Sequence, residues 1–342
     1  MELQEAIQIV KQRYQTDIAR INEEKAVIEK FGFMFHSDNL DRLTAENFKS
    51  FLLIKNNKHW TGIHRQGNII TSDMDKLRKV LKLLVDESKP IEERLDEIIP
   101  KNPKNKPLTI KGLGRAVLTP ILLVVHRDKY AVYNSIAEEG MRKFDILPKL
   151  KAESFAEKYV KINKKINDLA EKDGLSLWQM DDVWYEALAK PFPPEETRID
   201  EATEVSPDES EFEEIIIREW DRIPAFNGLE ILQEDGDLKG QQFNTNEVGK
   251  IDLLCRSKET GDFVVVELKR GKESDKVVGQ ALRYIGWVRK NLANKGQKVA
   301  GLIITKEEDT RLNYALEPIK DLIQLKFYKI SIKITDSISH SL

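Results

Sequence analysis

Two acidic residues and a lysine lie in the C-terminal third of the sequence at spacings that suit a chemical site. Asp252 is near the start of one short apolar run, and Glu267 and Lys269 are at the end of the next. The polar stretch SKETGD joins the two runs and predicts a β-hairpin. Because alternate side chains of a strand share a face, we expect Glu267 and Lys269 to point the same way. Asp252 should face them from the other strand of the hairpin.

This trio predicts a site for a divalent cation. Carboxylate oxygens are the ligands that Mg²⁺ prefers, and a bound Mg²⁺ lowers the pKa of water and stabilises charge on a phosphate. Lys269 would add a positive charge beside the attacking water or the scissile phosphate. The alternative is an exposed salt bridge on an amphipathic hairpin, which contributes little stability. The run VVVEL favours the site, since it is typical of a strand buried on both faces.

The elements around the trio predict an α/β domain. Strands are predicted from short apolar runs at 250–255, 263–268 and 299–304 and from FYKISIKI at 327–334. Helices are predicted at 208–222 and 276–292. A helix, strands, a helix and a strand in this order indicate a central sheet flanked by helices.

An acidic stretch divides the 342-residue chain. Residues 195–214 carry ten acidic residues and one basic residue, and three prolines just before them block regular structure. We therefore predict a mainly α-helical domain over 1–190, a linker over 191–207 and an α/β domain over 208–342. Within the first domain, helices are predicted at 2–31, 44–54, 73–86, 91–98, 114–126, 134–144 and 152–172.

The spacing of the trio resembles a known nuclease core. Asp252, fourteen further residues and then Glu267-Leu-Lys269 match the PD-(D/E)XK pattern. The strings GKIDLL, VVVELKRG, VGQALRYIGWV and GLIIT resemble the C-terminal catalytic domain of NucS-type (EndoMS-type) DNA endonucleases, over roughly residues 208–328. The resemblance implies a restriction-endonuclease-like core sheet flanked by helices, with Asp252 and Glu267 as metal ligands and Lys269 as the catalytic lysine.

The same resemblance implies further site residues on two helices. Gln280 and Tyr284 match family positions and lie four apart, hence on one helical face. The opening helix should add a glutamate from SEFEEIII, with Glu211 preferred and Glu214 as second choice. Acidic residues at a helix N-terminus also complement the helix dipole, which is the alternative explanation for them. The insertion ILQEDGDLKGQQ departs from the family.

Four basic residues near the trio are candidates for DNA contacts. They are Arg270, Lys272, Lys276 and Arg283. Contacts of such residues with phosphates position DNA without reading its sequence. A solvated charged face is the alternative.

A second resemblance lies in the predicted helical domain. Gly112, Gly114 and Arg115 resemble the helix-hairpin-helix of DNA glycosylases, whose glycines let backbone N–H groups approach a phosphate. The catalytic aspartate of those enzymes would fall at Asn134, so glycosylase chemistry is not expected. A plain helix junction is the alternative for this segment.

One more segment of this domain loosely resembles helical regions in front of restriction-type nucleases and McrB-like proteins. It covers residues 35–63 and contains the basic, aromatic stretch KNNKHW at 55–60. That stretch could bind DNA, or His59 and Trp60 could pack on the helical core.

Composition excludes several protein classes. The single cysteine, Cys255, excludes a disulfide framework and a cysteine-rich zinc module. No apolar run approaches the roughly 18 residues of a membrane span, and the N-terminus lacks the apolar core of a signal peptide, so we expect a cytoplasmic protein. The sequence has no Walker A, Gly-x-Ser-x-Gly or dinucleotide fingerprint.

These observations predict a Mg²⁺-dependent DNA endonuclease that acts in restriction or defence, with Mn²⁺ as a substitute ion. Repair-type cleavage of mismatched or branched DNA is one alternative, and a non-catalytic DNA-binding protein with a nuclease-like fold is another. The intact trio of Asp252, Glu267 and Lys269 favours an enzyme. We expect DNA as the partner and no membrane association. The resemblance to NucS-type enzymes, which dimerise, also implies a homodimer.

Overall fold

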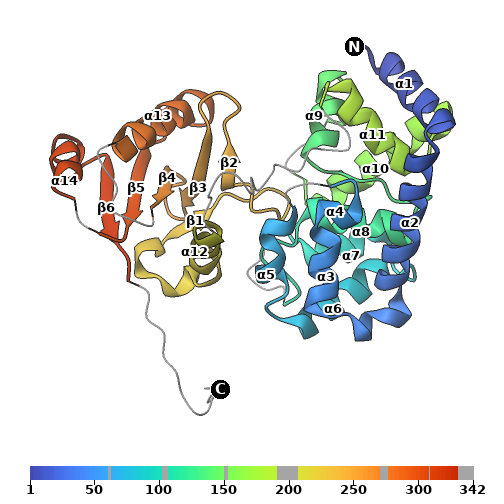
Figure 1. The fold of residues 1–342 in the computed structure, drawn as a ribbon, viewed down its shortest axis with the longest axis horizontal. Coiled ribbons are helices and arrows are strands. Elements are labelled where there is room, and N and C mark those ends of the chain that lie inside the picture. Colours follow the sequence, from blue (N-terminus) through green and yellow to red (C-terminus); the bar gives the residue numbers. More distant parts are fainter. Residues whose placement is uncertain are drawn as a thin grey trace. The chain divides into compact units, whose positions relative to one another are not determined.

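The chain forms two compact units (Figure 1). A computed structural model describes residues 1–60, 63–101, 107–149, 153–190, 207–269, 276–307 and 309–329, without the side chains of 207–211. The first unit comprises Met1–Val205 and Gln233–Leu238, and the second comprises Ser206–Leu232 and Lys239–Leu342. The short segment Gln233–Leu238 thus groups with the first unit, although its sequence neighbours belong to the second.

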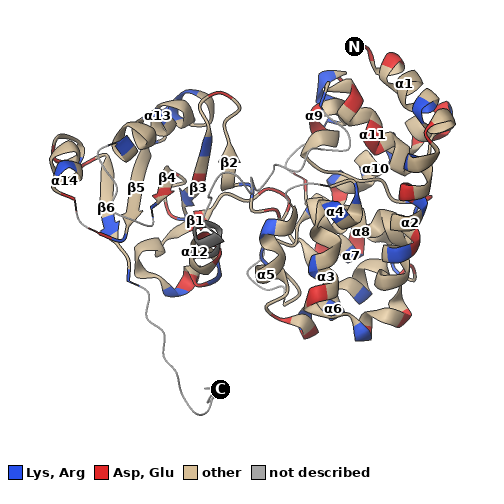
Figure 2. Cartoon of the chain, in the orientation of Figure 1, with Lys and Arg blue, Asp and Glu red and all other residues tan. Residues whose placement is uncertain are grey.

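The described part of the first unit is helical. Its α-helices are α1 (Leu3–Thr16), α2 (Ile18–Phe35), α3 (Ala45–Leu52), α4 (Ile54–Asn57), α5 (Gly67–Ile70), α6 (Met74–Val85), α7 (Ile91–Ile98), α8 (Arg115–Val125), α9 (Ser135–Lys143), α10 (Phe155–Asp173) and α11 (Leu177–Ala187). Polar caps fix several of their starts: the Thr44 side chain accepts from Asn47 N, and Ser154 and Ser176 open capping boxes. Figure 2 shows both signs of charge interspersed over these helices.

The segment predicted as helical over 2–31 forms two helices, because the chain breaks at Asp17. The Asp17 side chain accepts a hydrogen bond from Arg20 N and so caps a new helix, α2. Aspartate competes with the helical backbone in this way, and the apolar spacing on either side conceals the break. Helix α11 was not predicted at all.

The core of the first unit surrounds α8. Leu118, Ile121 and Leu122 of this helix are fully buried, as expected for a helix that is apolar on most sides. His59 and Trp60 are buried too. His59 Nε2 and Trp60 Nε1 both hydrogen-bond Asp181 Oδ2, at 2.9 and 3.0 Å. The stretch 55–60 therefore places these two rings in the core, where they cannot contact DNA.

The second unit is built on a mixed six-stranded sheet with flanking helices. Its strands are β1 (Leu229–Ile231), β2 (Gln241–Asn244), β3 (Lys250–Ser257), β4 (Phe263–Leu268), β5 (Val299–Thr305) and β6 (Ile323–Phe327), in the order β1-β3-β4-β5-β6 with β2 also paired to β3. The helices are α12 (Pro207–Arg218), α13 (Lys276–Asn291) and α14 (Thr310–Leu316). Strands β3 and β4 form an antiparallel hairpin, while β4, β5 and β6 run parallel.

Helix α13 covers the middle of this sheet. It follows β4 in the chain and precedes β5, which suits the crossover that two parallel strands require. Its apolar side chains, including Val277, Ala281 and Ile285, are buried with residues of β4 and β5. This packing fixes the positions of the polar residues of α13 relative to β4 and β5.

Of the strand predicted over 327–334, the structure describes only the first three residues. Phe327 ends strand β6, Tyr328 and Lys329 follow it, and residues 330–334 lie outside the described chain. The parallel register from Gly301 opposite Ile323 to Thr305 opposite Phe327 places β6 over residues before FYKISIKI, where no strand was predicted. The helix predicted over 208–222 likewise ends early, at Arg218. Across the described chain, no helix combines the length and apolar character that crossing a membrane requires.

Candidate functional site

The β3–β4 hairpin brings Asp252, Glu267 and Lys269 together. Leu253 pairs with Val266, so Asp252 and Glu267 stand opposite each other one position further along. Lys269 Nζ lies 3.3 Å from Glu267 Oε2 and 3.8 Å from Asp252 Oδ2. Asp252 is itself held in place, because its Oδ2 accepts a hydrogen bond of 2.8 Å from the backbone N–H of Leu268.

Glu267 is the most constrained member of this trio. Its side chain is 0% exposed, and among the described residues its Oε1 has no hydrogen-bond partner. Burial, and then repulsion from Asp252, raise the pKa of Glu267 to about 8, while Lys269 acts in the opposite direction. A buried carboxylate with an unsatisfied oxygen is costly unless a proton or a cation neutralises it.

These residues fit a hard divalent cation. Asp252 and Glu267 offer carboxylate oxygens on the same side of the hairpin, and Mg²⁺ is commonly held by one or two carboxylates while it keeps several waters. Within the ranges that the structure describes, no group of three or more His, Cys, Asp or Glu side chains is arranged to hold a metal. A bound ion would therefore complete its coordination with water, backbone oxygen or substrate.

Gln280 and Tyr284 lie on one face of α13. Gln280 Nε2 is 3.4 Å from Tyr284 Oη, and Tyr284 is 3% exposed. The same Oη packs against Gly249 just before β3, where a Cβ atom would be only 2.9 Å away. Gly249 also has a φ of +108°, which favours glycine. Tyr284 thus ties α13 to the chain that enters β3, three residues before Asp252.

The predicted acidic residues of α12 have different positions. Glu211 lies in the helix, but its side chain falls outside the described residues, and Glu214 is half-buried. Their neighbour Glu213 is buried and accepts hydrogen bonds from Gln241 Nε2 at 2.7 Å and Gln242 Nε2 at 2.5 Å. Sequence reasoning missed Glu213. The paired glutamines at the end of the insertion are the signal that could have found it, since adjacent amides suit a buried carboxylate.

The predicted DNA contacts near the trio are described in part. Lys276 is exposed at the start of α13. Arg283 is also exposed, with its guanidinium 5.3 Å from the ring centre of Tyr284. Arg270 and Lys272 lie outside the described residues.

The glycine-rich segment of the first unit is buried. Gly112 has a φ of +80°, and Arg115, the first residue of α8, is 3% exposed. Arg115 forms ion pairs with Glu138, Glu234 and Asp235, at 2.8, 3.3 and 3.0 Å. Asn134 caps α9 by accepting from Ala137 N at 2.9 Å, which is a structural role.

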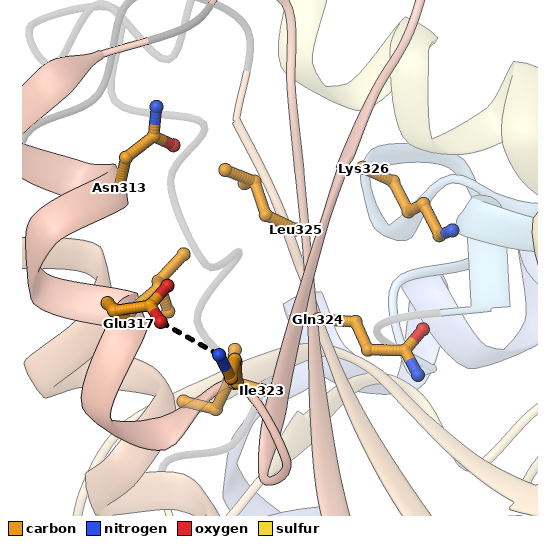
Figure 3. A pocket seen from close by; sticks show the side chains of 8 residues that line it. Asn313, Glu317, Ile323, Gln324, Leu325 and Lys326 are labelled. Atoms are coloured by element: carbon orange, nitrogen blue, oxygen red, sulfur yellow. Dashed lines mark hydrogen bonds and ion pairs between the residues drawn. The ribbon is translucent and has the colours of Figure 1, made fainter.

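A separate hollow of about 490 Å³ lies beside α14 and β6 (Figure 3). Leu316, Ile323 and Leu325 supply its apolar lining, and Glu317 forms an ion pair of 2.8 Å with Lys320 at its edge. None of the residues that line it belongs to the trio.

Comparisons with known proteins give two similar structures. No protein-family model and no curated protein matches the chain. Among solved structures, the chain is similar to an EndoMS–dsDNA2 complex, with a TM-score of 0.28, and to a repair endonuclease from Pyrococcus abyssi, with a TM-score of 0.27. Each match has 22% sequence identity, covers 36% of this chain and spans 46% of the other chain, which is less than half of its length.

Proposed function

We propose that the second unit is a metal-dependent DNA endonuclease domain of the PD-(D/E)XK type. The observation that carries this proposal is the juxtaposition of two carboxylates and one amine at the end of a buried strand, with an unsatisfied oxygen on Glu267. A buried carboxylate oxygen without a partner needs an explanation, and a bound cation beside Asp252 and Glu267 would supply one.

The proposal gives each residue a role. Asp252 and Glu267 would hold Mg²⁺, or Mn²⁺ in its place, and the ion would supply a water of lowered pKa and charge neutralisation at the phosphate. Lys269 places its ammonium within 4 Å of both carboxylates, where it can orient a water or bind a phosphate oxygen.

The surrounding residues support these three. The Gln280–Tyr284 pair fixes α13 against the start of β3, and Glu211, with Glu214 as second choice, would complete the site from α12. Arg270, Lys272, Lys276 and Arg283 would hold the DNA backbone through phosphate contacts.

We place this activity in restriction or defence, with the helical first unit as the part that recognises or positions DNA. Repair-type cleavage of mismatched or branched DNA remains an outcome of the test. The test incubates the full chain with plain, modified, mismatched and branched duplexes, with Mg²⁺, with Mn²⁺ and with a chelator. We expect cleavage that requires the ion and prefers one of these DNAs.

Variants connect the activity to the site. Asp252→Asn should abolish cleavage and leave DNA binding nearly intact, because Asp252 is expected to bind metal and not phosphate. Glu259→Gln is the matched control, since Glu259 is an exposed acid in the turn of the same hairpin. Equal cleavage by wild type and Asp252→Asn would remove the nuclease function from this site.

A further inference from the structure

The insertion between β1 and β2 forms an acidic turn, here defined as Glu234–Asp237, that groups with the first unit. The backbones of Glu234 and Asp237 exchange two hydrogen bonds, of 3.1 and 3.0 Å, which close the turn. Asp235 and Gly236 both have positive φ, at +48° and +84°. Three carboxylates are thereby displayed within four residues.

The start of α8 receives these carboxylates. The backbone N–H of Ala116 donates to both oxygens of Asp237, at 3.2 and 3.3 Å, and Arg115 N donates to the backbone oxygen of Asp235 at 3.1 Å. The first N–H groups of a helix have no partner within the helix and attract anions. The acidic turn therefore occupies positions that a phosphate group would satisfy equally well.

Two cations converge on the same place. Arg115 binds Glu234 and Asp235 through its terminal nitrogens, and Lys158 Nζ lies 3.1 Å from Asp235. The Arg115 Nε is buried and, in the described chain, has no hydrogen-bond partner, although Asp237 Oδ2 lies 3.8 Å away. Stacking over Tyr133, with 4.6 Å from guanidinium to ring centre, holds Arg115 in this direction. A planar guanidinium with an unused donor suits a phosphate.

The fit between the turn and the helix depends on two glycines. A Cβ on Gly114 would stand 2.2 Å from the backbone nitrogen of Asp237, and a Cβ on Gly236 would stand 2.9 Å from the Cα of Gly114. The two backbones thus approach each other too closely to leave room for a side chain at either position.

The docked turn is crowded with negative charge. Glu138 of α9, which is not part of the turn, pairs with Arg115 at 2.8 Å and with Arg142 at 2.7 Å. Four carboxylates therefore share Arg115, Lys158 and Arg142, and Arg115 has an acidic partner besides those of the turn. An anion that satisfies the same donors with less crowding can compete with it.

We propose that the acidic turn is an internal phosphate mimic, which occupies an anion site made by Arg115, Lys158 and the start of α8 and which a DNA phosphate displaces. The proposal rests on the proposed DNA endonuclease function, because it takes DNA as the ligand. It makes the turn an autoinhibitory contact that lowers the affinity of the first unit for DNA.

The test measures DNA binding by the full chain in a chelator, so that no cleavage occurs. The turn variant carries Glu234→Gln, Asp235→Asn and Asp237→Asn. The control variant carries Asp221→Asn, Glu230→Gln and Glu259→Gln, which remove the same charge from exposed sites elsewhere. We expect the turn variant to bind a duplex about tenfold more tightly than the control, the gain when a site occluded nine-tenths of the time is freed.

Salt dependence separates a freed site from a general charge effect. The turn variant should also show a salt slope steeper by about 0.9 to 1.8, since one or two phosphates gain contacts, and adding Arg115→Gln should reverse both gains. Equal affinity of turn and control variants would overturn the proposal. If the triple variant melts early, Asp237→Asn alone is compared with Asp221→Asn, and no gain in affinity there also overturns it.

The two proposals can fail separately. Metal-dependent cleavage with no gain in the turn variant would leave the nuclease and remove the mimic. If the turn variant binds DNA more tightly but no form of the chain cleaves DNA, the phosphate mimic stands and the nuclease function is removed.

Discussion

The two units each gather carboxylates around few cations, but they satisfy the oxygens differently. In the second unit, Asp252 and Glu267 share Lys269. In the first unit, four carboxylates share Arg115, Lys158 and Arg142, the last through Glu138. Carboxylates therefore outnumber cations in both groups.

What differs is the source of the remaining donors. Asp237 accepts from the N–H of Ala116, and the Glu234 side chain is 36% exposed, so helix and solvent complete the first group. Glu267 is fully buried, and in the described residues one of its oxygens has no donor. Charge ratio alone does not indicate a metal site. A buried oxygen without a partner is a further sign. The trio has one next to a second carboxylate, and so do Asp181 and Asp182 beside His59, so the end of a buried strand and the nearby Lys269 are what set the trio apart.

The largest effect should follow from Glu267→Gln. Cleavage should fall by about 10³-fold or more, because stabilisation of charge by a metal ion is worth several kcal/mol. Thermal stability should hold or rise, since the change removes a buried carboxylate that lacks a donor. Single-turnover cleavage and melting curves check both expectations, with Glu259→Gln as the control. If the Glu267→Gln variant cleaved DNA at the wild-type rate, the carboxylates around Lys269 would not differ in function from those around Arg115.

The next largest effect should follow from Arg115→Met. Removing one partner from a buried charge group should destabilise the first unit by about 3 kcal/mol. Neutralising the acidic turn should reduce that loss by about 1–3 kcal/mol in a double-mutant cycle, because the two changes share the same contacts. Denaturant unfolding measures the cycle, and Arg127→Met, an exposed arginine of the same unit, should cost under about 0.5 kcal/mol. Additive losses would mean that the turn does not depend on Arg115.

The juxtaposition of the three residues could be predicted from the sequence because its geometry is local. A two-residue alternation and a hairpin turn place Asp252, Glu267 and Lys269 on one side, and no distant contact is needed. The strand runs at 250–255, 263–268 and 299–304 were equally clear, since each is a short apolar segment.

The partners of Arg115 could not be predicted, because they depend on contacts across 120 residues. Nothing local relates the start of α8 to the acidic turn, and Gly114 fits a close approach by any backbone. Strands β1 and β2 were missed for the same reason, since they are short and gain their stability from pairing with β3.

A smaller effect concerns pH and metal affinity. The pKa of Glu267 is raised to about 8 without metal, so the carboxyl keeps its proton at pH 7 and must release it when a cation binds. Apparent affinity for Mg²⁺ should therefore rise with pH, by up to about tenfold per unit, and level off above about pH 8. Calorimetry in two buffers of different ionisation enthalpy measures both affinity and proton release. A flat profile in wild type, equal to that of Glu267→Gln, would contradict this.

The smallest effect compares a glycine from each unit. Gly279 is exposed within α13 and has nothing within 4 Å of an added Cβ, whereas Gly114 faces the acidic turn at 2.2 Å. Gly279→Ala should raise the stability of the second unit by about 0.5–1 kcal/mol, because alanine favours the helix and fills open space. Gly114→Ala should lower the stability of the first unit by about 1–3 kcal/mol, because the methyl group meets backbone that cannot move aside without undocking the turn. Calorimetric melting of the full chain measures both changes. A neutralised turn is held less tightly and moves aside more easily, so Gly114→Ala should lower stability less in the turn variant than in the wild type. An equal loss of stability in both would show that the effect of Gly114 is confined to α8.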